Sequence, residues 1–464
     1  MSQAKLAKRE VLASLIAAGI GLAGYVAVHA MSWTSNAKYS RALAGARKSG
    51  LPVTTAELAT TAPPADENAA TAYAQMTTLL NTHPISQDDM SLEEYSRLAH
   101  PTIAQTHQIK SSLARRSDLL QLAHQAASRP NCVFATDWKN PNPAAIIFPD
   151  LKTVREAARI ISSESVLMAR EGHGMQAVQN EALCFRIAQH AGSDGLPVQG
   201  IVQDAVNAIT LRSMQYILLA NPRDTEVAKA VMVSIDKNWK PAQVPSILRR
   251  ETAMQTGYIE YLRQAGPFGL LMIYDKDKPA AKMPDYEKQN WNTTLNENGM
   301  FMLSEMSKMT AASELPYPQA IAEEIAISAS RDNSTPQSDP SPLDHFIVYG
   351  DTRKRLNRTI GYMTLPVVSR PLRNAATDTA RARVTHTAAA ILNYKVIHGS
   401  LPTTLETIGS PIPVDPFDQQ PLRYRREGNG FVVYSVGSTL HYDGGTAGQP
   451  IAKTESAFRY PAAT

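Results

Sequence analysis

The chain has 464 residues, of which 43% are hydrophobic and 19% are charged, and its formal net charge is +4 at pH 7. This length is sufficient for more than one domain, and the hydrophobic content is that of a folded protein. The small net charge excludes the strongly basic composition of most nucleic-acid-binding domains, so we expect no nucleic-acid partner.

The composition favours a mainly α fold. Only 6% of the residues are aromatic, and alanine is abundant along the chain. Alanine is the best helix former, whereas β-sheets prefer aromatic and β-branched residues. We therefore expect helical bundles with little sheet.

The N-terminal segment predicts a transmembrane helix. Lys5, Lys8 and Arg9 precede an uncharged run at residues 11–33, which is long enough to cross a bilayer. The positive charges place the N-terminus inside and the bulk of the chain in the periplasm, at the bacterial inner membrane. A cleaved signal peptide ending at residues 28–30 is the alternative, but the length of the run favours an uncleaved signal anchor. No second such run exists, which excludes a multi-pass transporter.

The next part of the chain predicts a stalk and a helical ectodomain. Residues 34–65 contain Pro- and Thr-rich stretches and form the expected stalk, whereas residues 66–330 show apolar residues at helical spacing. The main expected helices cover residues 102–128, 150–170, 175–191, 197–219, 225–235, 244–264, 298–312 and 317–329.

The C-terminal part predicts an α+β unit. Residues 331–342 have the composition of a linker, and residues 343–464 begin with two helices at 343–369 and 372–398. Alternating strands at 422–426 and 431–435 flank a Gly-Asn turn, which is typical of an antiparallel hairpin. Together with a cytoplasmic tip and anchor at 1–33, this gives five expected segments.

The C-terminal unit resembles the distal domain of the major pseudopilin of type II secretion systems. The matching residues are Gly399, Leu401, Pro402, Leu405, Asp415, Pro416, Phe417, Tyr424, Tyr434, Ser435, Gly437, Asp443 and Gly444. The whole chain resembles membrane-anchored bacterial proteins that join a helical ectodomain to such a tail and carry no assigned activity. The cleavable pilin leader is missing, which argues against assembly as a pilin subunit.

The resemblance implies a candidate calcium site in this unit, because pseudopilins can hold calcium in a distal loop. Asp415 and Asp443 are the candidate ligands. Calcium prefers six to eight oxygen ligands with several carboxylates, and Ser438 and Thr439 stand where an acidic residue is expected. The alternative is that Asp443 and the glycines after it simply form a turn. We therefore expect no cofactor and keep calcium as the only candidate metal.

A basic cluster predicts a candidate interaction patch. Arg353, Lys354, Arg355 and Arg358 open a segment that also contains Arg370, Arg373, Arg381 and Arg383 but only one acidic residue, Asp378. Such a patch could meet anionic lipids, a cell-wall polymer or an acidic partner. The alternative is the solvated outer face of two helices.

No catalytic motif is recognisable in the sequence. The glutamates Glu251, Glu260, Glu305, Glu323 and Glu324 fit solvated helix faces, and His190 fits the surface or a satisfied core position. Cys132 and Cys184 either form a disulfide or stay as buried thiols. We expect a non-enzymatic scaffold or interaction protein of the envelope, with envelope or secretion proteins as candidate partners. The alternatives are an envelope enzyme with scattered site residues and a small-ligand binder.

Overall fold

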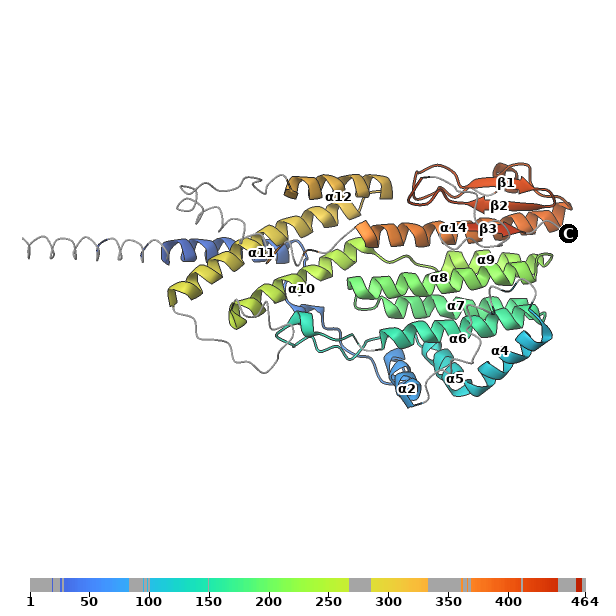
Figure 1. Ribbon diagram of the computed structural model, residues 1–464, viewed down its shortest axis with the longest axis horizontal. Helices are drawn as coiled ribbons and strands as arrows, with labels where there is room; N and C mark the ends of the chain where they lie inside the picture. Colours follow the sequence, from blue (N-terminus) through green and yellow to red (C-terminus); the bar gives the residue numbers. More distant parts are fainter. Residues whose placement is uncertain are drawn as a thin grey trace, which may run out of the picture.

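The protein is an elongated, mainly helical molecule with one small sheet (Figure 1). The computed structural model describes residues 19, 26, 29–82, 95, 98, 101–148, 150–266, 285–332, 360, 361, 365, 369–409, 412–440 and 456–460. The expectation of a mainly α fold with an antiparallel hairpin near the C-terminus is confirmed.

One end of the molecule is a helical bundle centred on α6, α7 and α8 (Figure 1). Its helices are α2 (Ala69–Thr82), α4 (Ile103–Arg115), α5 (Ser117–Ser128), α6 (Leu151–Arg170), α7 (Gly174–Ala191), α8 (Pro197–Ala220) and α9 (Thr225–Asn238). Short 3₁₀ helices, η1 (Thr55–Leu58) and η2 (Pro143–Ala145), lie in the connections. Both pack against the next long helix, α10 (Val244–Ala265).

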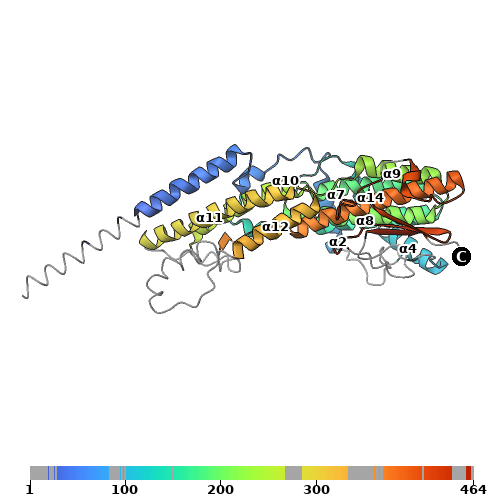
Figure 2. The same cartoon turned by 90° about the horizontal axis from the view of Figure 1, so that it is seen from above.

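The other end contains a helix at residues 29–48 together with α10, α11 (Asp285–Ser313) and α12 (Tyr317–Asp332) (Figure 2). The N-terminal helix packs closely on α11. Tyr39 is buried there, and its ring lies so near Gly299 that a Cβ at this glycine would be 2.4 Å from a ring carbon. The stalk predicted over residues 34–65 therefore begins as a packed helix.

The long helix α14 (Ser369–His398) connects the two ends and carries the C-terminal sheet (Figure 1). After η4 (Leu405–Ile408), strands β1 (Arg423–Glu427) and β2 (Gly430–Tyr434) pair antiparallel, and β3 (Ala457–Tyr460) pairs antiparallel with the other edge of β2. Arg426 faces Phe431, which in turn faces Tyr460. Gly399 ends α14 with φ +71, a conformation that glycine adopts without strain.

Local signals account for the starts of α4, α8 and α9. Thr102 forms a capping box with Gln105 at the start of α4, and the Asp224 carboxylate accepts two backbone N–H groups at the start of α9. Pro197 stands in the first turn of α8, where its missing N–H costs nothing. These caps explain why the predicted starts of these helices agree closely with the structure.

One hydrophobic core joins the bundle to the C-terminal unit. Phe185 and Leu211 of the bundle share it with Ile391 of α14 and with Phe431 and Phe458 of the sheet, all fully buried. Alanines on α14 let that helix approach α8 and α9 closely; they include Ala382, Ala388 and Ala389. Truncating a large side chain of such a core commonly costs several kcal/mol, so the sheet and the bundle stabilise each other.

The prediction of a transmembrane helix and signal anchor is corrected by the structure. Across the described part of the chain, no helix is long and apolar enough to cross a membrane. Of the apolar run at residues 11–33, only residues 19, 26 and 29–33 are described. The described helix at residues 29–48 buries Ser32 and Ser35 against protein, and Asn36 accepts a hydrogen bond of 2.6 Å from the Asn296 side chain.

Other boundaries also differ from the expectations. Arg116 interrupts the helix expected at 102–128, dividing it into α4 and α5, and α11 begins well before residue 298. Strand β3 was not predicted. The linker expected at 331–342 begins inside α12, which ends at residue 332, and its other residues lie outside the described part of the chain. Most of the helix expected at 343–369 also lies outside it. Cys132 and Cys184 are both buried as free thiols, which resolves the alternative between a disulfide and core positions.

Candidate functional site

An open groove of about 390 Å³ lies where α14, the C-terminal unit and two inter-helix connections meet. This size falls within the usual range of ligand pockets, roughly 300–1,000 Å³. Its lining is mostly apolar and rich in proline. The lining residues are Pro241, Ala242, Gln243, Val244, Pro245, Ser313, Leu315, Pro316, Tyr317, Leu372, Ala375, Ala376, Thr379, Arg383, Val414, Pro416 and Gln419.

The wall formed by residues 241–245 is fixed to α8 by polar side chains. Gln203 and Asn207 both donate to the Lys240 carbonyl, at 3.2 and 3.0 Å. The Asp204 carboxylate accepts the backbone N–H of Ala242, and this bond lowers its pKa. Burial outweighs the bond, and with the nearby Asp378 it raises the pKa of Asp204 to about 8. Hydrogen bonds at the Lys240 carbonyl and the Ala242 N–H therefore hold this connection against α8.

The wall formed by the C-terminal unit is fixed by Asp415. Its carboxylate is fully buried and accepts hydrogen bonds from the Phe417 N–H at 3.1 Å, the Ser435 hydroxyl at 2.9 Å and the Val436 N–H at 2.8 Å. Arg423 lies 3.5 Å from the same carboxylate. Asp415 thus ties the 413–421 loop to the end of β2, which keeps Val414, Pro416 and Gln419 beside α14.

The turn between α11 and α12 closes the groove on its third side. Tyr317 packs edge-on against Phe417, with ring centroids 4.9 Å apart, so this turn contacts the C-terminal unit directly. Leu315 and Val414 nevertheless remain 42% and 40% exposed at the groove. Leu315 and Val414 thus add exposed apolar surface to the groove, and ligand sites are commonly concave and lined by apolar side chains.

Arg383 supplies the charge of the groove. Of the described side chains that line it, Arg383 is the only one with a full charge at neutral pH. Its Nη1 donates to the Val414 carbonyl. Partial burial lowers the pKa of Arg383, while the field of Asp415 acts in the opposite direction. The site therefore combines apolar walls with one guanidinium that is partly removed from water.

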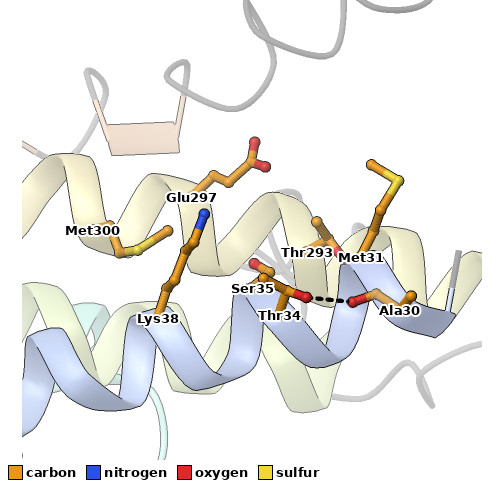
Figure 3. A pocket seen from close by; sticks show the side chains of 8 residues that line it. All are labelled: Ala30, Met31, Thr34, Ser35, Lys38, Thr293, Glu297 and Met300. Atoms are coloured by element: carbon orange, nitrogen blue, oxygen red, sulfur yellow. Dashed lines mark hydrogen bonds between the residues drawn. The ribbon is translucent and has the colours of Figure 1, made fainter. Parts of the chain in front are cut away.

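A second pocket, of about 340 Å³, lies between the N-terminal helix and α11 (Figure 3). Ala30, Met31, Thr34, Ser35 and Lys38 line one side, and Thr293, Glu297 and Met300 line the other. The Lys38 and Glu297 side chains extend toward the same side of the pocket in Figure 3, and the Thr34 hydroxyl donates to the Ala30 carbonyl at 2.7 Å. This pocket borders N-terminal residues outside the described part of the chain, so the groove is the better-defined candidate site.

Several buried ionisable groups lie in the helical core, away from the groove lining. Glu181 is fully buried and accepts hydrogen bonds from Ser213 at 2.6 Å and Ser162 at 3.1 Å. Burial raises its pKa to about 8, although the serine hydroxyls oppose the shift. His190 donates from Nε2 to the Arg129 carbonyl and accepts from Tyr73, and burial lowers its pKa to about 4. His190 is thus a satisfied core residue, one of the two predicted alternatives.

The predicted site residues have different outcomes. Asp415 is buried and engaged in the hydrogen bonds above, while Asp443 lies outside the described residues. Among described residues, no group of three or more His, Cys, Asp or Glu side chains is arranged to hold a metal ion. The basic cluster Arg353, Lys354, Arg355 and Arg358 also lies outside the described residues, so this patch stays a prediction.

Sequence reasoning missed the groove and misplaced one carboxylate. Arg383 was counted in a basic patch, yet it lines the groove, and Arg381 on the same helix lies near the buried Asp378. Glu305, expected on a solvated face, is 3% exposed and pairs with Lys308 at 2.7 Å. Prolines are turn signals in a sequence, but nothing local indicates that the segments carrying Pro241, Pro245, Pro316 and Pro416 meet.

Comparison of the chain with protein-family models, with curated proteins and with solved structures finds no match. The resemblance to pseudopilins therefore rests on the sequence motifs alone, and it stays a prediction. The function has to be argued from the geometry of the groove.

Proposed function

We propose that this chain is a non-enzymatic scaffold protein that docks a partner protein in the groove beside α14. The observation that carries the proposal is the exposure of Leu315 and Val414 in a concave, proline-lined surface whose three walls are each fixed by specific contacts. A preformed surface binds without the entropic cost of ordering its own loops.

The buried polar groups support a scaffold better than an enzyme. Glu181, Asp378 and Asp415 accept hydrogen bonds that hold helices or loops together. Because these carboxylates hold structural elements together, their burial is explained without assigning them a catalytic role. Perturbed carboxylates at catalytic sites are instead expected to converge on a pocket that admits substrate.

Envelope or secretion proteins are the candidate partners in this proposal. Support comes from the motifs shared with pseudopilins and from the order of a long helix, α14, followed by an antiparallel sheet. Placement of the bulk of the chain in the periplasm stays a prediction, which cell fractionation with a protease-accessibility assay would test.

The proposal is tested by photo-cross-linking in the native host. Benzoylphenylalanine is placed at Leu315 or Val414 in the groove, and at Ile103, which is 91% exposed on α4, as the matched control. We expect a discrete adduct with one partner from both groove positions and none from position 103. Adducts that are absent from the groove positions, or equal at all three, would reject docking in the groove.

A further inference from the structure

We propose that the groove binds an extended, acidic peptide segment of the partner and that a carboxylate of this segment pairs with Arg383. This inference rests on the proposed function, and it adds the chemistry of the occupant. It is carried by the charge of the groove, by the hydrogen-bonding groups left on its walls and by its shape.

The charge of the groove is not neutralised by its surroundings. The field of the Asp415 carboxylate reaches Arg383, but this carboxylate already accepts three hydrogen bonds and lies 3.5 Å from Arg423. The Arg383 side chain donates a single hydrogen bond among the described residues, from Nη1 to the Val414 carbonyl. Its remaining N–H groups are therefore available to a carboxylate, which a guanidinium can bind through two parallel hydrogen bonds.

The partial burial of Arg383 makes an anionic occupant favourable. Burial lowers the pKa of this guanidinium, which means that its charge is already less well solvated than that of a surface arginine. A carboxylate that enters the groove replaces the lost solvation with a charge-assisted hydrogen bond.

Two glutamines offer hydrogen bonds to a peptide backbone. Gln243 donates from Nε2 to the Pro241 carbonyl at 3.1 Å, and Gln419 donates to the Pro416 carbonyl at 3.0 Å. The side-chain carbonyl of each has no partner among the described residues, and both residues are exposed at the groove. An extended peptide leaves its own N–H and C=O groups unpaired, so it can use such amides, whereas a helix cannot.

The shape of the groove also favours an extended chain. Pro241, Pro245, Pro316 and Pro416 provide rigid apolar walls, and the groove is open rather than enclosed. Its volume of about 390 Å³ accommodates a few side chains, and its open form lets the rest of a partner continue beyond it. Apolar residues next to an acidic one would fill the space beside Leu315 and Leu372.

The test is a selection of random heptapeptides, displayed on phage, against the purified full-length chain. Enriched peptides are synthesised with a fluorescent label, and their affinities are measured by anisotropy for the wild type, R383Q and R373Q. R383Q removes the charge of this side chain but keeps a polar amide at the position. Arg373 is an exposed arginine of the same helix that does not line the groove, so it is the matched control. Thermal unfolding checks that each variant is folded.

We expect peptides that combine aspartate or glutamate with apolar residues. R383Q should weaken their binding about tenfold or more, the scale of one lost charge-assisted pair, and R373Q should leave it unchanged. Neutral or basic peptides that bind R383Q as tightly as the wild type would overturn the acidic occupant, while docking in the groove would stand. Failure to enrich any peptide whose binding is blocked by L315W, which fills the groove, would overturn both.

Discussion

At the scale of single residues, Glu181 places an ionisable carboxyl in the middle of the helical core. Its pKa is raised by burial from 4.5 to about 8, so the folded protein keeps a proton that the unfolded chain releases. The stabilising contribution of this proton is fully present below pH 4.5 and is lost as the pH rises through 8.

The substitution E181Q should remove this pH dependence, because glutamine cannot ionise. We expect E181Q to unfold at the same urea concentration as the wild type near pH 4.5 and at a higher concentration at pH 9. Between these two pH values, the difference in free energy of unfolding between E181Q and the wild type should grow by on the order of 1 kcal/mol per pH unit. If this difference in free energy of unfolding does not change with pH, Glu181 is not protonated in the folded state.

Asp415 has a structural role, because its carboxylate accepts hydrogen bonds from its own loop and from the end of β2. Replacement by alanine leaves the Val436 N–H, the Phe417 N–H and the Ser435 hydroxyl without this acceptor. We expect D415A to lower the free energy of unfolding by about 3 kcal/mol and D415N to lower it less, as measured by urea denaturation.

The wild type and D415N also test the calcium hypothesis. If Asp415 acts only through these hydrogen bonds, calcium and a chelator should leave the melting temperature of the wild type unchanged. A rise in melting temperature with calcium that D415N abolishes would instead establish Asp415 as a metal ligand.

At the scale of elements, the seam between α14 and the bundle contains buried polar contacts. Asp378 on α14 accepts hydrogen bonds from Asn207 of α8 at 2.8 Å and from the Trp239 indole at the end of α9 at 3.0 Å. Burial raises the pKa of Asp378 to about 6, and Arg381 opposes the shift. Gln215 and Thr385 add a further hydrogen bond of 2.8 Å along the same seam.

We expect D378A to weaken this seam, because it leaves the Trp239 indole N–H and one N–H of the Asn207 amide without an acceptor. The free energy of unfolding should fall by about 2–4 kcal/mol in D378A. It should fall less in D378N, because the asparagine amide keeps one acceptor oxygen. Urea unfolding followed by tryptophan fluorescence measures both. Surface substitutions usually change the free energy of unfolding by no more than about 0.5 kcal/mol. A decrease of that size or smaller for D378A would mean that the seam does not depend on this residue.

The elements that sequence predicted well are those with local signals. α6, α7 and α8 lie within one residue of their predicted bounds because apolar periodicity, Gly172 to Gly174 and Pro197 define them. β3 was missed because its four residues are too short for a period and pair only through β2. The burial of Glu305 could not be inferred either, since its helix has charged and apolar residues on all sides and packing decides which face is covered.

At the scale of the whole molecule, the groove exists only because distant segments meet. Residues 241–245, 313–317, 372–383 and 414–419 form it, and each alone reads as a turn, a helix or a loop. Asp204 and Asn207 hold the first segment, Tyr317 joins the second to Phe417, and Asp415 holds the last. Sequence patterns identify such turns, whereas the tertiary contacts that align them have no local signature.

The central claim is that a partner docks in this groove through Arg383. The most direct measurement is affinity purification of the tagged full-length chain from its native host, with quantitative mass spectrometry for the wild type, R383Q and R373Q. We predict a partner that is recovered in stoichiometric amounts with the wild type and with R373Q but is strongly depleted with R383Q. Equal recovery of every co-purifying protein with all three chains would contradict the claim.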